Sequence, residues 1–178
     1  RLRKFQARAQ LLHSTDPKPY VKEPIRLPVH ELELFLDIEV DPMRDLCYLH
    51  GFVERRGGNN ATEKYVAFFA RDTTPAAEEE AFAGAWCYIS QSRPCAFYYY
   101  SKYERTIWRK LQAKYPGVCN ATEIEALFDP TDAIDLYYDV VRSKTEWPTN
   151  DFSIKTLAKF LGFYWRDAHP SGTASIQW

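Results

Sequence analysis

The sequence lacks several features that would assign it to a class at once. It has no apolar run near the ~18 residues that span a bilayer, and no secretory signal opens it. It also lacks an excess of one charge, because 23 Lys and Arg face 24 Asp and Glu, which gives a net charge of -1. A uniformly basic coat is therefore excluded, and any nucleic-acid binding has to come from a local patch. We expect a soluble, cytoplasmic protein with no membrane partner.

Cysteine patterns that bind metals or form disulfide frameworks are missing as well. The four cysteines are far apart, with no Cys-x-x-Cys pair and no nearby pair of histidines: Cys47, Cys87, Cys95 and Cys119. A zinc site is not expected, and the thiols are predicted to be reduced and mostly buried. Methionine is nearly absent, since Met43 is the only one and the chain begins at Arg1. This start suggests a piece of a longer protein.

What the sequence does contain is enough apolar material for a core. Of its 178 residues, 46% are hydrophobic and 16% are aromatic, which fits one folded domain. Residues 1–28 are interpreted as a tail or linker of a preceding domain. Within it, residues 1–10 form a basic, helix-prone run, more simply a solvated helix face than a nucleic-acid contact, and residues 14–28 are rich in proline. The folded domain is predicted over residues 29–178.

Hydrophobic periodicity and turn residues predict the elements of this domain. Strands are expected over residues 34–40, 46–55, 64–71 and 94–100, the first three forming an antiparallel meander around turns at Asp41-Pro42 and residues 57–60. Helices are expected from Thr74-Pro75, over residues 101–115 and 120–128, from Asp129-Pro130 or Thr131 through Val141, and over residues 152–163. The last would turn Ile154, Leu157, Phe160 and Leu161 inward and stop at Gly162. This order predicts an α/β sandwich with a mixed sheet flanked by helices.

The strand at residues 34–40 carries two acids, Asp37 and Glu39, in an apolar context. A spacing of two places both carboxylates on one face of a strand. Neighbouring buried carboxylates are costly, and a hard cation such as Mg²⁺ or Mn²⁺ would keep both ionised. The alternative is a strand whose second face is wet, with both acids solvated.

Several blocks of the chain resemble, in order, a known family. They are residues 35–42, 46–51, 99–104 and 134–137, and residues 152–155 together with 161–163. With the strand order and the Asp-x-Glu, they are similar to the ribonuclease-H-like superfamily of 3′ to 5′ exonucleases with four metal-binding carboxylates (DEDD type). In particular they resemble the predicted nuclease domain that follows a RecB-like nuclease in certain bacterial proteins. The opening residues 5–8 look like the end of that preceding region.

The resemblance implies a set of site residues. Asp37 and Glu39 match the first motif, and Glu104 stands where the second motif has aspartate. A local alternative for Glu104 is a capping box with Ser101. Asp135, expected on a later helix, would complete the cluster, unless it is only an acid favoured by a helix N-terminus. No final Tyr-x-x-x-Asp or His-x-x-x-Asp follows Glu104. We therefore expect the fourth ligand beyond Trp178, after the block at residues 171–178, and a truncated domain that folds without being active.

The implied activity is metal-dependent hydrolysis of phosphodiester bonds in DNA or RNA, with an exonuclease acting on single strands expected. It would use two Mg²⁺ or Mn²⁺ ions held by Asp37, Glu39, Glu104 and Asp135. Lys155, Lys102 and Tyr103 are candidate nucleic-acid contacts, and the alternative for Lys155 is a solvated lysine. Tyr98 to Tyr100 could stack on bases, but core packing is favoured for them.

Two rival functions remain open. One is a catalytically incomplete module that binds nucleic acid or docks a flanking RecB-like nuclease or helicase domain. The other is a scaffold that binds no metal.

Overall fold

A computed structural model of the chain describes residues 2–164. Its contacts divide the chain into two units. One unit, Leu27–Asp135, is called the sheet domain here, and the other, the terminal unit, joins the residues up to Arg26 with those from Leu136 onward. Each unit is described by itself. Whether residues 1–28 belong to a preceding domain stays a prediction.

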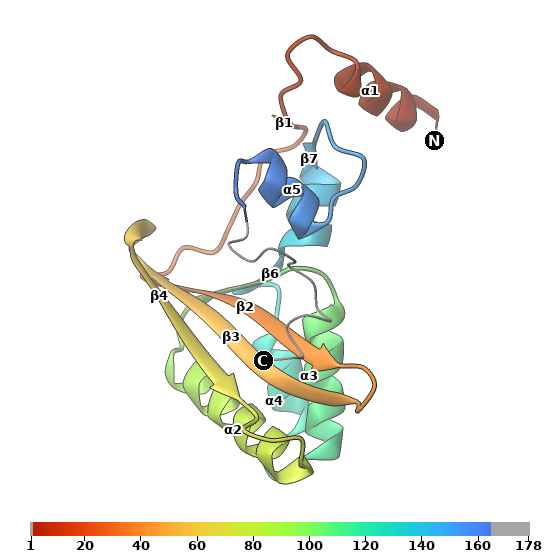
Figure 1. Cartoon of the computed structure of the whole chain (residues 1–178). Helices are drawn as coiled ribbons and strands as arrows, with labels where there is room; N and C mark the ends of the chain where they lie inside the picture. Colours follow the sequence, from red (N-terminus) through yellow and green to blue (C-terminus); the bar gives the residue numbers. More distant parts are fainter. Residues whose placement is uncertain (1, 165–178) are drawn as a thin grey trace. The chain divides into compact units, whose positions relative to one another are not determined.

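The sheet domain is built on a mixed sheet of five strands (Figure 1). The strands are β2 (Leu32–Asp41), β3 (Leu46–Arg56), β4 (Asn59–Phe69), β5 (Ala96–Tyr99) and β6 (Ala133–Asp135). Their order is β4-β3-β2-β5-β6, and β3 is antiparallel to both β2 and β4. Strand β5 runs parallel to β2, and β6 runs parallel to β5. The predicted mixed sheet with an antiparallel meander is confirmed.

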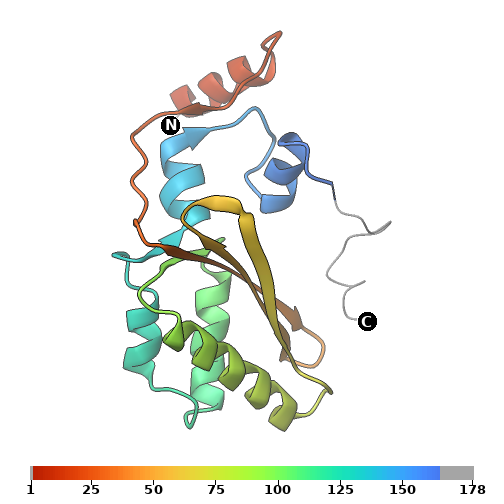
Figure 2. The same cartoon turned by 90° about the vertical axis from the view of Figure 1, so that its left-hand side faces the viewer.

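Three helices cover one face of this sheet (Figure 2). They are α2 (Pro75–Gln91), α3 (Tyr103–Lys114) and α4 (Ala121–Leu127). Helix α2 begins as expected, because the Thr74 side chain accepts the Ala77 N–H and Pro75 needs no donor there. Helix α4 begins with a capping box between Asn120 and Glu123.

The core lies between these helices and the sheet. On β2, Leu34, Leu36 and Ile38 are at most 5% exposed, and they alternate with more exposed positions. Trp108 of α3 is fully buried and meets the rings of Phe52 and Phe82 edge-on. The face of the sheet that points away from α2, α3 and α4 is called the open face below.

The structure corrects one predicted strand boundary and one predicted helix. The third strand begins at Asn59 and not at residue 64, because Gly57 and Gly58, both with positive φ, complete the turn between β3 and β4. The helix expected from Asp129-Pro130 or Thr131 is replaced by β6 and a π-helix, η1 (Leu136–Arg142). Residues 133–135 form a strand because they pair with β5. Such pairing overrides the local apolar periodicity that predicted a helix.

The terminal unit contains, besides η1, the elements α1 (Leu2–Leu12), β1 (Tyr20–Val21), β7 (Thr145–Glu146) and α5 (Ile154–Phe160). Strands β1 and β7 pair antiparallel. The last helix is shorter than expected, and Leu157 is its buried residue. Ile154, Phe160 and Leu161 are 54%, 38% and 68% exposed. The inward orientation predicted for these three residues is therefore wrong.

Three further predictions concern the thiols, membrane-spanning segments and the C-terminus. All four cysteines are free thiols, three of them buried and Cys87 exposed. No helix within residues 2–164 is both long and apolar enough to cross a bilayer. The predicted block at residues 171–178 lies outside the described residues.

Candidate functional site

Strand β2 presents the predicted acid pair on the open face. Because side chains alternate along a strand, burial of Leu36 and Ile38 directs Asp37 and Glu39 to the opposite side. Asp37 is exposed and Glu39 is half-buried. The register between β2 and β3 shifts directly after Glu39, which marks a bulge of the kind found beside functional sites.

Glu104 lies in the first turn of α3 and is only 5% exposed. The capping box considered for it does not form. The helix begins after Lys102, whose side chain makes no capping bond, and the Ser101 N–H donates instead to Asp135 Oδ1 at 3.0 Å. A helix-capping role therefore does not explain why position 104 carries a glutamate.

Asp135 is the last residue of β6, not part of a helix, so its predicted place on a helix is wrong. It pairs with Tyr99 at the end of β5, directly before the turn that leads to Glu104, and it is 4% exposed. Parallel strands end at the same edge of a sheet. The acids of β2 and β6 thus lie at one edge of the sheet, where the turn after β5 leads to Glu104.

The charges of these residues act on one another. Burial, together with the carboxylates of Asp37 and Asp135, raises the pKa of Glu104 to about 8. Glu104 Oε2 is buried and has no hydrogen-bond partner among the described residues. Within residues 2–164, however, no group of three or more His, Cys, Asp or Glu side chains is arranged so that it would hold a metal ion.

Two tyrosines border the acids. Burial and the charges of Asp37 and Glu39 raise the pKa of Tyr65 on β4. For Tyr103 on α3, burial is the main cause of a raised pKa, and Cys47, Glu39 and Glu104 add to it. Their side chains are 60% and 50% exposed, so both are open to a ligand.

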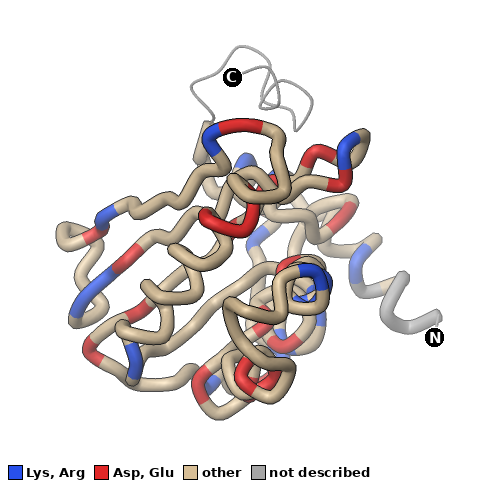
Figure 3. The backbone as a smooth tube through the Cα atoms, turned by 90° about the horizontal axis from the view of Figure 1, so that it is seen from below, with Lys and Arg blue, Asp and Glu red and all other residues tan. Residues whose placement is uncertain are grey.

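The other predicted nucleic-acid contacts are less well placed. Lys102 is exposed beside Tyr103, but Lys155 is exposed on α5, which belongs to the terminal unit and not to the sheet domain that carries the acids. Tyr98 and Tyr99 are 2% and 7% exposed, which confirms the favoured core packing. Acidic and basic residues are interspersed along the described chain (Figure 3).

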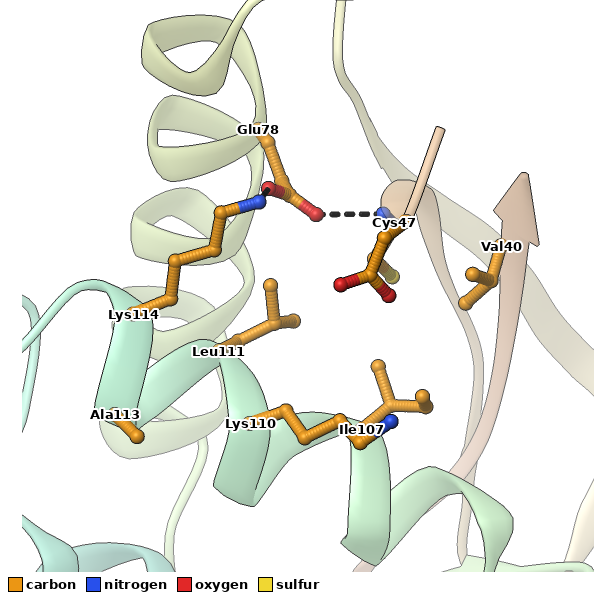
Figure 4. Close-up of a pocket in the computed structure, with 9 residues that line it drawn as sticks. Val40, Cys47, Glu78, Ile107, Lys110, Leu111, Ala113 and Lys114 are labelled. Carbon is orange, nitrogen blue, oxygen red and sulfur yellow. Dashed lines mark hydrogen bonds and ion pairs between the residues drawn. The ribbon is translucent and has the colours of Figure 1, made fainter. Parts of the chain in front are cut away.

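A separate pocket of about 290 Å³ lies between α3 and the β2–β3 hairpin, and its lining includes none of the four predicted ligands (Figure 4). At its side Glu78 is 1% exposed and accepts three hydrogen bonds. The donors are the Cys47 N–H at 2.6 Å, Lys114 Nζ at 2.5 Å and the Tyr115 hydroxyl at 2.6 Å. Glu78 thereby ties β3 to the end of α3, the helix whose first turn carries Glu104.

Comparison with known proteins agrees with this architecture. A family model described as "RNase_H superfamily" matches residues 34–178. The chain belongs to the RNase H superfamily. No curated protein sequence matches it significantly.

The RNase H-like fold is also seen in a solved structure, the zinc-bound form of an E. coli ExoI–ssDNA complex. That structure has a TM-score of 0.51 and 18% sequence identity, over 83% of this chain. The chain spans 39% of the length of that ExoI chain. At this identity the likeness concerns the fold.

Sequence reasoning missed Tyr65 and Glu78. Tyr65 shares its face of β4 with residues 63, 67 and 69, but which strand face meets the acids depends on a register that sequence does not reveal. Glu78 stood in a run of acids at the start of a helix, where solvation favoured by the helix dipole is the simple interpretation. The sequence around Glu78 does not indicate that this acid points inward.

Proposed function

We propose that this RNase H-like domain is a nuclease that hydrolyses phosphodiester bonds of single-stranded DNA or RNA, as an exonuclease dependent on Mg²⁺ or Mn²⁺. The observation that carries the proposal is Glu104, a buried acid with an unpartnered oxygen, within reach of the charges of Asp37 and Asp135. An isolated buried carboxylate is costly unless a cation or a proton neutralises it. The ExoI structure, a zinc-bound complex with single-stranded DNA, supports the same chemistry.

The residues present fit a hard divalent cation. Carboxylate oxygens are its preferred ligands, and Asp37, Glu39, Glu104 and Asp135 would supply them. When bound, such ions generate a hydroxide nucleophile and neutralise charge that develops on the scissile phosphate. Asp37, exposed on the open face, is accessible to a polymer, whereas Glu104 is shielded from water. One oxygen of Asp135 is held by the Ser101 N–H, which fixes the direction of that carboxylate.

A second candidate is supported by the lack of a preformed metal cluster within residues 2–164. In that case the domain binds nucleic acid, or docks a flanking RecB-like nuclease or helicase domain, without cleaving.

Calorimetry with Mn²⁺ and degradation of end-labelled oligonucleotides separate the candidates. The wild type is expected to bind Mn²⁺, and a chain extended past Trp178 is expected to shorten single-stranded DNA or RNA stepwise from one end. Asp37→Ala and Glu104→Gln should lose both properties. Glu80→Ala, at an exposed acid on α2, should keep them.

Two results would decide against nuclease activity. Mn²⁺ binding without cleavage, also in a chain extended past Trp178, would favour the non-catalytic module. Absence of Mn²⁺ binding would overturn the metal site itself.

A further inference from the structure

Gly51 lies in the interior of β3, where glycine weakens a strand and often marks a close approach by another group. It pairs with Asp37 on β2 and with Ala67 on β4. Residues directly opposite one another share a face of the sheet. Gly51 therefore leaves a gap on the open face directly beside Asp37.

The ring of Tyr65 fills this gap. Tyr65 pairs with Val53, two residues from Gly51 along β3, and so lies on the same face. The Tyr65 side chain extends diagonally from β4 toward Gly51 on β3. Its hydroxyl lies 2.7 Å from the position that a Cβ of residue 51 would occupy. The Cε2 and Cζ atoms lie at 3.1 and 3.3 Å from the same point. A Cβ at position 51 would therefore displace the Tyr65 hydroxyl from its place beside Asp37.

An aromatic ring laid over a glycine can serve the sheet alone, by covering the exposed backbone. A phenylalanine would do this equally well, so that role does not explain the hydroxyl. The hydroxyl is a neutral donor, and it lies where two carboxylates, Asp37 and Glu39, act on it. A lysine at this position would compete with a cation for those carboxylates, whereas a phenol can meet an anionic ligand without doing so.

We propose that the Tyr65 hydroxyl donates a hydrogen bond to a phosphate of the nucleic-acid strand that lies over Asp37 on the open face. Tyr65 is then a substrate-binding residue, and Gly51 is the residue that positions it. This inference rests on the proposed function, because the carboxylates alone would repel a phosphate. The ring, 60% exposed, needs no rearrangement to meet a strand.

The test compares Tyr65→Phe with the wild type. Phenylalanine keeps the ring over Gly51 and removes only the hydroxyl. Binding of fluorescein-labelled single-stranded oligothymidine is measured by anisotropy in Ca²⁺, and Mn²⁺ binding is measured by calorimetry. A hydrogen bond to a charged group corresponds to a loss of about tenfold or more in oligonucleotide affinity. Mn²⁺ affinity should stay within about twofold, since the acids remain.

Two further variants complete the test. Gly51→Ala, whose Cβ would displace the hydroxyl, should weaken oligonucleotide binding in the same way. Tyr20→Phe, at an exposed tyrosine on β1, should bind as the wild type does. Thermal unfolding midpoints show that each variant is folded.

The outcomes separate this inference from the function on which it rests. A wild type that binds neither Mn²⁺ nor oligothymidine overturns both. A wild type that binds both, with Tyr65→Phe indistinguishable from it, overturns the role of Tyr65 alone. If Tyr65→Phe loses Mn²⁺ together with the oligonucleotide, the hydroxyl orients the acids and does not contact phosphate, and the inference is wrong.

Discussion

Replacing Glu104 by glutamine is expected to abolish a pH-dependent loss of stability. The pKa of Glu104 is raised from 4.5 to about 8, first by burial and then by the charges of Asp37 and Asp135. Between these values the folded protein keeps a proton that the unfolded chain releases, so the free energy of unfolding falls as the pH rises. The stabilising contribution is fully present below pH 4.5 and is lost as the pH passes through about 8.

The size of this effect follows from the two pKa values. Each unit between them corresponds to about 1.4 kcal/mol, so the wild type should lose about 4 to 5 kcal/mol between pH 4 and pH 9 through this one group. Glutamine has nearly the same shape but does not titrate. Relative to the wild type, Glu104→Gln should therefore gain stability steadily as the pH is raised.

Urea unfolding in the presence of a chelator, followed by tryptophan fluorescence at several pH values, measures this difference. Glu80→Gln, at an exposed acid, is the control and should follow the wild type. Added Mn²⁺ should restore stability to the wild type at high pH, because a cation favours the ionised carboxylate, and should do little for Glu104→Gln. Parallel stability curves for the wild type and Glu104→Gln would refute the reasoning.

Three further changes test the fold. Phe52→Ala, at a fully buried ring, should lower the free energy of unfolding by about 3 to 5 kcal/mol in urea. Glu78→Ala should cost about 3 kcal/mol because buried donors such as the Cys47 N–H lose their acceptor, whereas Glu79→Ala, at an exposed neighbour, should cost little. Gly57→Ala, at a φ of +56°, should lower stability by about 1 kcal/mol, and an unchanged thermal midpoint would contradict the left-handed turn.

The sheet was largely predictable because its strands carry strong local signals. Residues of β2 alternate between more buried and less buried positions. Thr74 followed by Pro75 indicates the start of α2. Strand β6 was missed for a physical reason. It has three residues and exists through its pairing with β5, while the apolar spacing around it also suits a helix.

The candidate site was predictable only in part. A spacing of two on one strand is a local property, so the shared face of Asp37 and Glu39 could be inferred. That the Ser101 N–H would donate to Asp135, and not to the Glu104 side chain as in a capping box, depends on where β6 lies beside β5. The place of Tyr65 near Asp37 depends on how β2, β3 and β4 pair with one another. No local sequence pattern encodes the register of three strands.

The parallel arrangement of β2, β5 and β6 has a consequence for synthesis of the chain. Asp37 leaves the ribosome early, but Asp135 is among the last residues of the sheet domain to emerge. The edge of the sheet where the acids meet is incomplete until β6 pairs with β5. A nascent chain interrupted before β6 would thus display its first two carboxylates without the neighbour that anchors the turn before Glu104.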